Sequence, residues 1–585
     1  MKISRYPFII AVSFGVSLMA FLSCSRWFKP AAPKLAVVIV VDQLRFDYLT
    51  RYAGLFSGGF AKLLAEGAIF TNAHQDHAAT ETAPGHATLL TGSFPSHHGI
   101  IANEWLLRGA SRQIYSVDDS NFALVISPTF PNQKNIQEDR GKSPQKLLRH
   151  TLGDWLKAKA PQAKVISIAG KDRSAILMAG FEADAAYWFS SAHGAFVSSR
   201  YYLEALPDWV SRWNEARPAD RFYRQAWEKS RPEENYFLSR EDLFAAESDG
   251  EHTTFPHSFI NPEEADTAAA AKINSRFYDW MMSTPFLDRL TLEFAQQALQ
   301  AEQLGADATP DLLLVSLAAT DYIGHSYGPL SQECEDQLLR LDVELAKFFA
   351  ALDRKVGLKN CVIALSADHG VLPLPEELRR RGFEAARILR NEALEEVKSV
   401  ERELQEEWRT TRPIFRTYLG EINLDYHIAD SLNMTPAAFR ARVAVKLRSL
   451  SFVHDIFTYD ELQAADGAGR AFIEKQRRSF HPERSPDLLM QLKPHYLVTS
   501  RLQGTTHGSP YEYDSHVPLI FWGARIKAGR FDTPQRTVDL APTLAHLLNL
   551  EFPADLQNRV RQPRPGSAAA QSAVDGEVLH AALNE

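Results

Sequence analysis

The sequence predicts an α/β fold, a three-layer α/β/α sandwich around a largely parallel central sheet. Short apolar runs alternate with helical patterns along the chain, which is typical of parallel strands joined by covering helices. The run KLAVVIVVD (34–42) is continuous and rich in β-branched residues, as in strands buried on both faces. DLLLVSLAATD (311–321) and NCVIALSADHG (360–370) repeat this pattern, and HVPLIFWG (516–523) adds a fourth predicted strand.

Composition limits the classes of function. The chain has 585 residues, of which 45% are hydrophobic and 23% charged, so it contains enough apolar material for a large core. Its formal net charge of -8 disfavours a general nucleic-acid-binding protein, since binding the phosphate backbone requires a basic surface. We therefore expect no nucleic-acid partner, although a local site for a small anion remains compatible with this charge.

The N-terminal stretch MKISRYPFIIAVSFGVSLMAFLSCS has a basic start, a long apolar run and small residues at its end. This pattern predicts a signal peptide over residues 1–24 and an exported, periplasmic protein; the alternative is an uncleaved membrane anchor. Cys24 follows Phe-Leu-Ser, which loosely resembles a bacterial lipoprotein cleavage box, so attachment to a membrane through a lipidated Cys24 is a second hypothesis. Cys334 and Cys361 are too few for a disulfide scaffold or a cysteine-based metal site, and whether they pair is open.

The rest of the chain is predicted to form one large domain over residues 34–550. Two segments break the strand and helix rhythm, at about 186–300 and 372–485, because they are rich in aromatic and charged residues. We interpret them as insertions that cap the domain. The tail over 553–585, rich in Ala, Gln, Pro and Gly, is predicted to be loosely ordered.

Acidic residues and histidines gather where the predicted strands end. The carboxyl ends of strands in open α/β sheets meet at the edge where ligands bind. Alone, each residue has an ordinary interpretation, since an Asp there often caps a turn and a loop His is usually structural. Together they supply three carboxylates and three imidazoles, which suit two divalent ions of the zinc type able to assist an in-line displacement at phosphorus. These residues are Asp42, Asp321, His325, Asp368, His369 and His507.

The stretch TETAPGHATLLT (80–91) offers several hydroxyl groups that could act as a nucleophile. Thr82 precedes Ala-Pro-Gly-His, and a proline close to a helix start makes Thr82 the predicted N-cap. A purely structural cap is the alternative. A hydroxyl at this place also lies in the positive field of the helix end, where a phosphoryl group finds backbone N–H donors. We therefore select Thr82 as the candidate nucleophile.

Five short motifs in order carry a specific resemblance: VVDQLRFDYL, TAPGHATLLTGSFPSHHGIIANEW, TDYIGHSYGP, SADHG and HGSPYEYDSHVPLIFWG. The chain resembles the alkaline phosphatase superfamily in its nucleotide pyrophosphatase/phosphodiesterase branch, from about residue 35 to 550 apart from the insertions. The resemblance implies that Thr82 is phosphorylated and that Asn103 donates to a phosphoryl oxygen. It also implies two zinc ions, one held by Asp321, His325 and His507, the other by Asp42, Asp368, His369 and the Thr82 oxygen. The three histidines of the second motif, His86, His97 and His98, are expected to support the turn.

The segment VISIAGKDRSAILMAG bears on the substrate. If residues 171–173 are extended, Lys171 and Arg173 face one way and Asp172 the other, although such a run is ordinarily a solvated turn. The segment resembles the Lys-x-Arg of the PafA-type alkaline phosphatases, monoesterases whose two cations contact phosphoryl oxygens. The resemblance implies a two-zinc alkaline phosphatase that hydrolyses small phosphate monoesters through a phosphothreonine.

Two alternatives remain. The first is a phosphodiesterase or nucleotide pyrophosphatase of the same fold, with an apolar wall for a nucleoside. The second is a non-catalytic phosphate- or glycan-binding surface protein. A sulfatase is excluded, because sulfatases require Cys or Ser where this chain has Thr82 and Arg where it has His86.

Overall fold

The computed structural model describes residues 31–106, 112–127, 140–259, 273–418, 420–464, 469–550 and 574–584. The predicted signal peptide and Cys24 lie outside these residues. Within them, no helix combines the length and the apolar character needed to cross a membrane.

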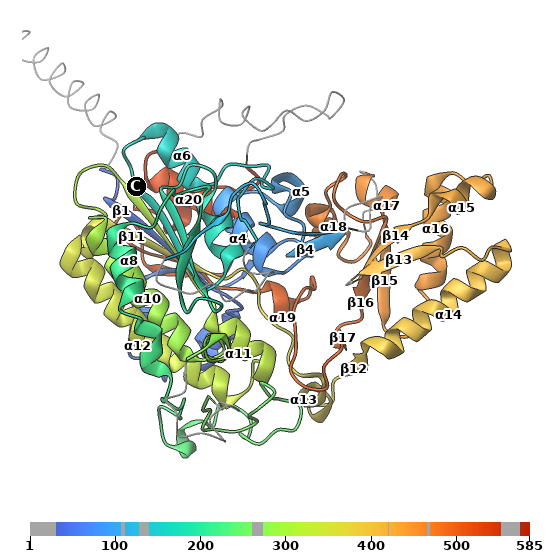
Figure 1. The fold of residues 1–585 in the computed structure, drawn as a ribbon, viewed down its shortest axis with the longest axis horizontal. Coiled ribbons are helices and arrows are strands. Elements are labelled where there is room, and N and C mark those ends of the chain that lie inside the picture. Colours follow the sequence, from blue (N-terminus) through green and yellow to red (C-terminus); the bar gives the residue numbers. More distant parts are fainter. Residues whose placement is uncertain are drawn as a thin grey trace, which may run out of the picture.

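A large sheet forms the centre of the molecule (Figure 1). Its middle strands, β11 (Cys361–Ser366), β1 (Leu35–Val41), β10 (Asp311–Leu317), β7 (Val165–Ala169) and β8 (Ala185–Ser190), are parallel. On one side follow the antiparallel strands β9 (Ala195–Ser199) and β6 (Leu124–Val125). On the other side follow β18 (Leu519–Gly523), β2 (Ala68–Phe70) and β19 (Gly529–Phe531). The predicted α/β fold with a largely parallel sheet is confirmed.

Helices cover both faces of this sheet because its central strands are apolar on both sides. The whole of β1 is buried, and alternate side chains contribute to two separate cores. One core lies between the sheet and helices α10 (Pro285–Ala301) and α12 (Gln332–Lys355). The other lies between the sheet and α4 (Thr82–Thr91), α7 (Asp172–Ala179) and α20 (Leu540–Leu547). The molecule therefore has the three layers predicted from the sequence.

Strand β18 runs against β11, with Leu519 paired to Ser366. The start of β18 therefore lies beside the end of β11, and the loop that precedes β18 reaches the edge where β1, β10 and β11 end. This reversal brings His507 to the same edge as the strand-end aspartates.

A cap lies at one end of the molecule, at the right of Figure 1. It contains a second sheet of β13 (Phe415–Tyr418), β14 (Glu421–Leu424), β16 (Leu488–Leu492) and β15 (Val453–Thr458), covered by α14 (Arg390–Trp408) and α16 (Pro436–Leu447). The pair β12 (Ala386–Leu389) and β17 (Tyr496–Thr499) adjoins it. The predicted insertion over 372–485 thus ends too early, because β16 and β17 follow residue 485.

Two other predicted boundaries are wrong. The segment 186–300 is not wholly an insertion, because β8 and β9 belong to the central sheet and α10 packs against it. The tail is not loosely ordered over residues 574–584, since Leu579, Ala582 and Leu583 are buried against the core. Asp575 also accepts hydrogen bonds from the Phe94 N–H and the His97 ring. The segment 551–573 lies outside the described residues.

Candidate active site

The six predicted metal ligands converge at the carboxyl edge of the sheet. Asp42 directly follows β1, and Asp368 and His369 follow β11 at the second residue and the third. Helix α11 (Ala319–Tyr327) begins two residues after β10 and places Asp321 and His325 one turn apart on one face. His507 comes from the loop before β18. One edge of the fold therefore collects residues that are up to 465 positions apart, from 42 to 507.

Asp321 is the centre of the first set of ligands. Its Oδ1 lies 3.2 Å from His325 Nε2 and 3.6 Å from His507 Nε2. Each ring uses its other nitrogen as a donor: His325 Nδ1 donates to the Thr505 carbonyl at 2.8 Å, and His507 Nδ1 donates to the Thr80 carbonyl at 2.7 Å. These bonds orient the Nε2 atoms of both rings toward Asp321, as in metal sites whose histidines are held by a second hydrogen bond.

The second set comprises Asp42, Asp368 and His369, all fully buried. His369 Nε2 lies 3.5 Å from Asp42 Oδ1 and 3.5 Å from Asp368 Oδ2, while its Nδ1 donates to the Gly370 carbonyl. These three facing atoms have no hydrogen-bond partner among the described residues. Buried polar atoms that lack a partner are costly, and a cation bound between them would satisfy all three. The residues present therefore fit a metal ion.

The two sets are contiguous. The rings of His369 and His507 stack with centroids 3.5 Å apart. Ligand atoms that lie within 4.8 Å of one another belong to Asp42, Asp368 and His369 in one group and to Asp321, His369 and His507 in the other. His369 is thus common to both groups, whereas the sequence assigned it to one set and placed His325 in the other.

Protonation supports a role for these side chains as metal ligands. Burial lowers the pKa of His507 well below its ordinary value and also lowers the pKa of His369, so both rings are neutral with lone pairs available. Burial would raise the pKa of Asp321, but the adjacent His325 and Lys171 hold it well below its ordinary value. Burial, and after it the Asp368 charge, raise the pKa of Asp42. Excess negative charge at Asp42 favours binding of a cation.

Lys171 lies between the two sets of ligands. Its Nζ is 2.7 Å from Asp42 Oδ2 and 2.5 Å from Asp321 Oδ2, and its side chain is 2% exposed. Burial opposes the charged form, but the Asp321 and Asp42 carboxylates raise the pKa of Lys171 above its ordinary value, so the amine is protonated. Tyr322 lies beside it, with Nζ 4.9 Å from the ring centroid.

Arg173 contacts the candidate nucleophile. Its Nη2 donates to Thr82 Oγ1 at 3.3 Å, and its Nη1 donates to the Tyr115 hydroxyl at 3.3 Å. The condition that residues 171–173 are extended is not met, because α7 begins at Asp172 and only the N-cap Lys171 is extended. Lys171 and Arg173 nevertheless both reach the site, while Asp172 turns away and accepts from Tyr115 at 2.5 Å.

Thr82 is the first residue of α4, so the predicted N-cap is one residue too late and Glu81 occupies that position. The N-terminus of α4 is held closely by its neighbours. Asn103 Oδ1 accepts from the Ala83 N–H at 2.8 Å, which leaves the side-chain NH₂ as the end of Asn103 that can donate to a ligand. A Cβ on Gly85 would lie 2.4 Å from the Asp368 carbonyl oxygen, so only glycine allows α4 to approach the second ligand set.

The sequence interpretation missed three contributors. Gln43 donates from Nε2 to Asp321 Oδ1 at 2.6 Å, and its backbone N–H donates to Asp368 Oδ1 at 3.1 Å. Gln43 has φ of 68°, unusual for a residue with a Cβ, and contacts the first ligand set through its side chain and the second through its backbone N–H. Tyr115 contacts Arg173 through its hydroxyl, and Tyr322 contacts Lys171 through its ring. Gln43 and Tyr322 lie within two of the quoted motifs, but no local pattern shows which side chains these three residues contact, because the contacts are with distant segments.

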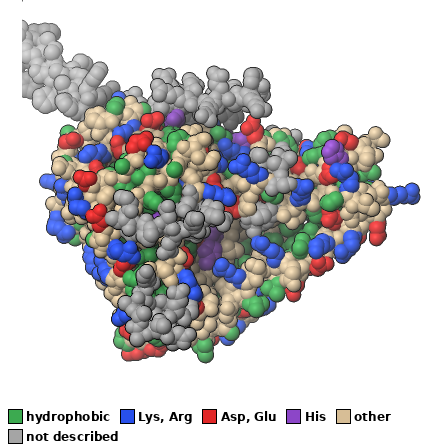
Figure 2. Space-filling view, in the orientation of Figure 1, with side chains coloured by type: hydrophobic (Ala, Val, Ile, Leu, Met, Phe, Trp, Pro, Cys, Tyr) green, Lys and Arg blue, Asp and Glu red, His purple; other side chains and the backbone are tan. Residues whose placement is uncertain are grey.

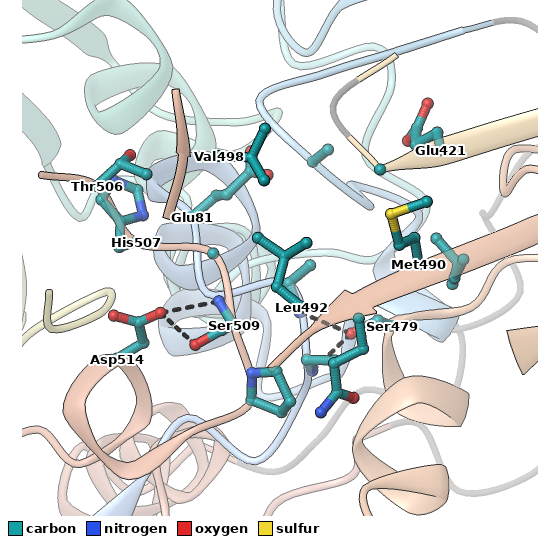
Figure 3. A pocket seen from close by; sticks show the side chains of 18 of the residues that line it. Glu81, Glu421, Ser479, Met490, Leu492, Val498, Thr506, His507, Ser509 and Asp514 are labelled. Atoms are coloured by element: carbon teal, nitrogen blue, oxygen red, sulfur yellow. Dashed lines mark hydrogen bonds between the residues drawn. The ribbon is translucent and has the colours of Figure 1, made fainter. Parts of the chain in front are cut away.

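A cleft of about 790 Å³ opens above the site, between the body and the cap. Asn103, Arg173, Asp321, His325 and His507 line it from the body. From the cap come apolar side chains that include Met490, Leu492 and Val498 (Figure 3). In the space-filling view, histidine atoms are visible in the hollow between body and cap (Figure 2). The site is therefore open to a small molecule that carries both an anionic and an apolar part.

The comparisons with known proteins agree with this geometry. Residues 36–512 match the family model of the type I phosphodiesterases / nucleotide pyrophosphatases. The chain belongs to this family. It is 32% identical over 529 residues to alkaline phosphatase PafA of Elizabethkingia meningoseptica, covering 89% of this chain and 92% of that protein.

Similarity extends to other relatives and to a solved structure. The chain is 34% identical over 553 residues to alkaline phosphatase PhoK of Sphingomonas sp, with 91% of each protein covered. It is 34% identical over 538 residues to a calcium-transporting ATPase of Myroides odoratus, covering 90% of this chain and 93% of that protein. The crystal structure of wild-type PafA superposes with a TM-score of 0.81 at 30% identity, covering 95% of this chain and all of that one. The chain is therefore a phosphoesterase of this family, with two groups of residues at its candidate site that could hold metal ions.

Proposed function

We propose that this protein is a two-zinc alkaline phosphatase that hydrolyses phosphate monoesters through a phosphothreonine formed at Thr82. The observation that carries the proposal is a pair of cations at the candidate site: the half-buried Arg173, whose Nη2 lies 3.3 Å from Thr82 Oγ1, and the buried Lys171, whose amine lies between Asp42 and Asp321. A monoester presents three charged non-bridging oxygens, so its transition state gains from cations that a diester cannot use fully.

Two zinc ions would be held at the site. The ligands of one would be Asp42, Asp368, His369 and Thr82, and those of the other Asp321, His325 and His507. The ions would supply Lewis-acid charge at the attacking and leaving oxygens. The protein's own groups do the rest. Thr82 Oγ1 attacks phosphorus in line and the alcohol leaves on the opposite face. Arg173 and the Asn103 amide donate to the equatorial oxygens, and the α4 N-terminus adds its dipole. Hydrolysis of the phosphothreonine then regenerates the Thr82 hydroxyl.

The test of this proposal is the variant Thr82→Ala. It is expected to abolish phosphoryl transfer while the metal content remains that of the wild type. Thr82→Ser is the matched control, since it retains a hydroxyl at the same backbone position and should retain measurable turnover. Full activity of Thr82→Ala would overturn the proposal.

A second function, hydrolysis of phosphodiesters, is favoured by one observation. The cap presents apolar side chains to the cleft, as a diesterase needs for the second ester group or a nucleoside. The two cations Lys171 and Arg173 argue against it, because a diester offers fewer charged oxygens for them to contact.

The proposed place of action is the periplasm, with residues 1–24 as the export signal and Cys24 as the site of a lipid anchor. Cell fractionation of the wild type and of Cys24→Ser tests this part. The wild type is expected with the membranes and the variant in the soluble periplasmic fraction.

A further inference from the structure

A second cluster of metal-ligand residues lies outside the candidate active site, in the segment 246–258. Asp249, His252 and His257 each offer one ligand atom, and these atoms lie within 4.8 Å of one another. His252 Nδ1 is 3.0 Å from Asp249 Oδ2, and the rings of His252 and His257 are 5.2 Å apart between centroids. His257 is buried and the other two are partly buried, so the cluster is not a set of solvated surface charges.

The contacts of His257 orient it as a ligand. Its Nε2 lies 3.1 Å from Glu333 Oε1, and its Nδ1 lies 3.2 Å from the Tyr327 hydroxyl. When Nε2–H donates to the Glu333 carboxylate, Nδ1 carries the lone pair of the ring, the arrangement in which carboxylates support metal-bound histidines.

Glu333 supplies an independent observation. It is fully buried, and its Oε2 has no hydrogen-bond partner among the described residues. A divalent cation bound beside His257 would interact favourably with this buried carboxyl group.

We propose that Asp249, His252 and His257 bind a third divalent metal ion, of the zinc type, with Glu333 orienting His257. Two imidazoles and one carboxylate suit zinc, whereas calcium and magnesium prefer ligand sets made of oxygen. The ion would displace the proton shared by Asp249 and His252. The Tyr327 hydroxyl stands beside the cluster at the far end of α11 from Asp321.

The position of this ion suggests what it stabilises. Ser248 N–H donates to the Ser326 carbonyl at 3.1 Å, and His257 pairs through its backbone with Trp227. The third ion would therefore fix the segment 246–258 against the end of α11, the helix that carries two ligands of the candidate active site. We expect a structural ion, not one that contacts substrate.

The test is the zinc content of purified protein, measured by mass spectrometry after equilibration with zinc and dialysis into metal-free buffer. His252→Gln is expected to contain one equivalent of zinc fewer per chain than the wild type. The matched control is His97→Gln, because His97 also pairs with an aspartate, Asp575, at 2.8 Å but belongs to no such three-ligand group among the described residues. This control should keep the wild-type content.

The test compares the zinc content of the variant with that of the wild type, so its outcome does not depend on how many ions the candidate active site holds. Asp249→Asn, which is isosteric, serves as a second variant if His252→Gln does not fold, as judged by circular dichroism. Loss of one equivalent in a folded variant supports the third site. Wild-type zinc content in folded His252→Gln or Asp249→Asn overturns it, whatever the phosphatase activity of the protein.

Discussion

The guanidinium of Arg173 lies 3.3 Å from the hydroxyl of Thr82, measured from Nη2 to Oγ1. Burial disfavours its charge, but the neighbouring Tyr115 and Asp172 raise the pKa of Arg173, so it is a permanent cation beside the nucleophile. A fixed donor at this distance can follow an oxygen that becomes more negative on the path to the transition state.

Removing both cations should affect the two kinds of ester unequally. Lys171→Ala combined with Arg173→Ala is expected to lower kcat/KM for an aryl phosphate monoester by roughly 10²-fold or more, and to lower it less for the methyl diester. The control carries Arg200→Ala and Lys347→Ala, at side chains 59% and 55% exposed. An equal loss for both esters would assign Lys171 and Arg173 to folding.

Tyr115 should act through Arg173. Its hydroxyl accepts from Arg173 and donates to Asp172 at 2.5 Å, so Tyr115→Phe removes one support of the guanidinium. We expect monoester kcat/KM to fall by about tenfold, the effect of one hydrogen bond to a charged group, with diester turnover less affected. Tyr426→Phe is the control, since Tyr426 makes a comparable bond to Asp487 within the cap. Unchanged monoester turnover in Tyr115→Phe would contradict this role.

Gln43 should position a metal ligand. The substitution Gln43→Glu replaces the amide that donates to Asp321 with a carboxylate beside Asp321 and Asp368. Loss of such a supporting bond lowers metal affinity by about 10–100-fold, and we expect zinc to be removed by correspondingly weaker chelators. The exposed residue Gln225 gives the control Gln225→Glu. Wild-type resistance to chelators in Gln43→Glu would exclude this role.

Gly85 should be intolerant of even one methyl group. A Cβ there meets the Asp368 carbonyl at 2.4 Å, whereas a Cβ on Gly54 meets nothing within 4 Å. We expect Gly85→Ala to lower the free energy of unfolding by about 1–3 kcal/mol and to weaken zinc binding, because α4 and the Asp368 turn must separate. Gly54→Ala should resemble the wild type in a denaturant titration. Equal stability of the two variants would show that α4 moves without cost.

The sequence predicted the features that follow from local pattern. Continuous apolar runs predicted the parallel strands, and the rule that ligands gather at their carboxyl ends predicted that Asp42, Asp321 and Asp368 would meet. The start of α4 was predicted within one residue, because proline and glycine mark helix ends locally.

Features that depend on long-range packing were missed or misplaced. The segments that form β8 and β9 were assigned to an insertion, because their aromatic residues do not show the apolar pattern of a buried parallel strand. Gln43 carries no signal, since its importance comes from contact with Asp321 across 278 positions. For residues 171–173 the sequence left an extended geometry and a solvated turn as alternatives, because the pattern could not show that Asp172 begins a helix. The first turn of that helix directs Arg173 toward Thr82.

The most direct test of the proposed monoesterase activity is the ratio of kcat/KM for an aryl phosphate monoester to that for the corresponding methyl diester, with the same leaving group and the purified, zinc-loaded protein. Because Arg173 and Lys171 present positive charge at the candidate site, we predict a strong preference for the monoester. Equal turnover of the two esters, or a preference for the diester, would contradict the account and identify the protein as a phosphodiesterase.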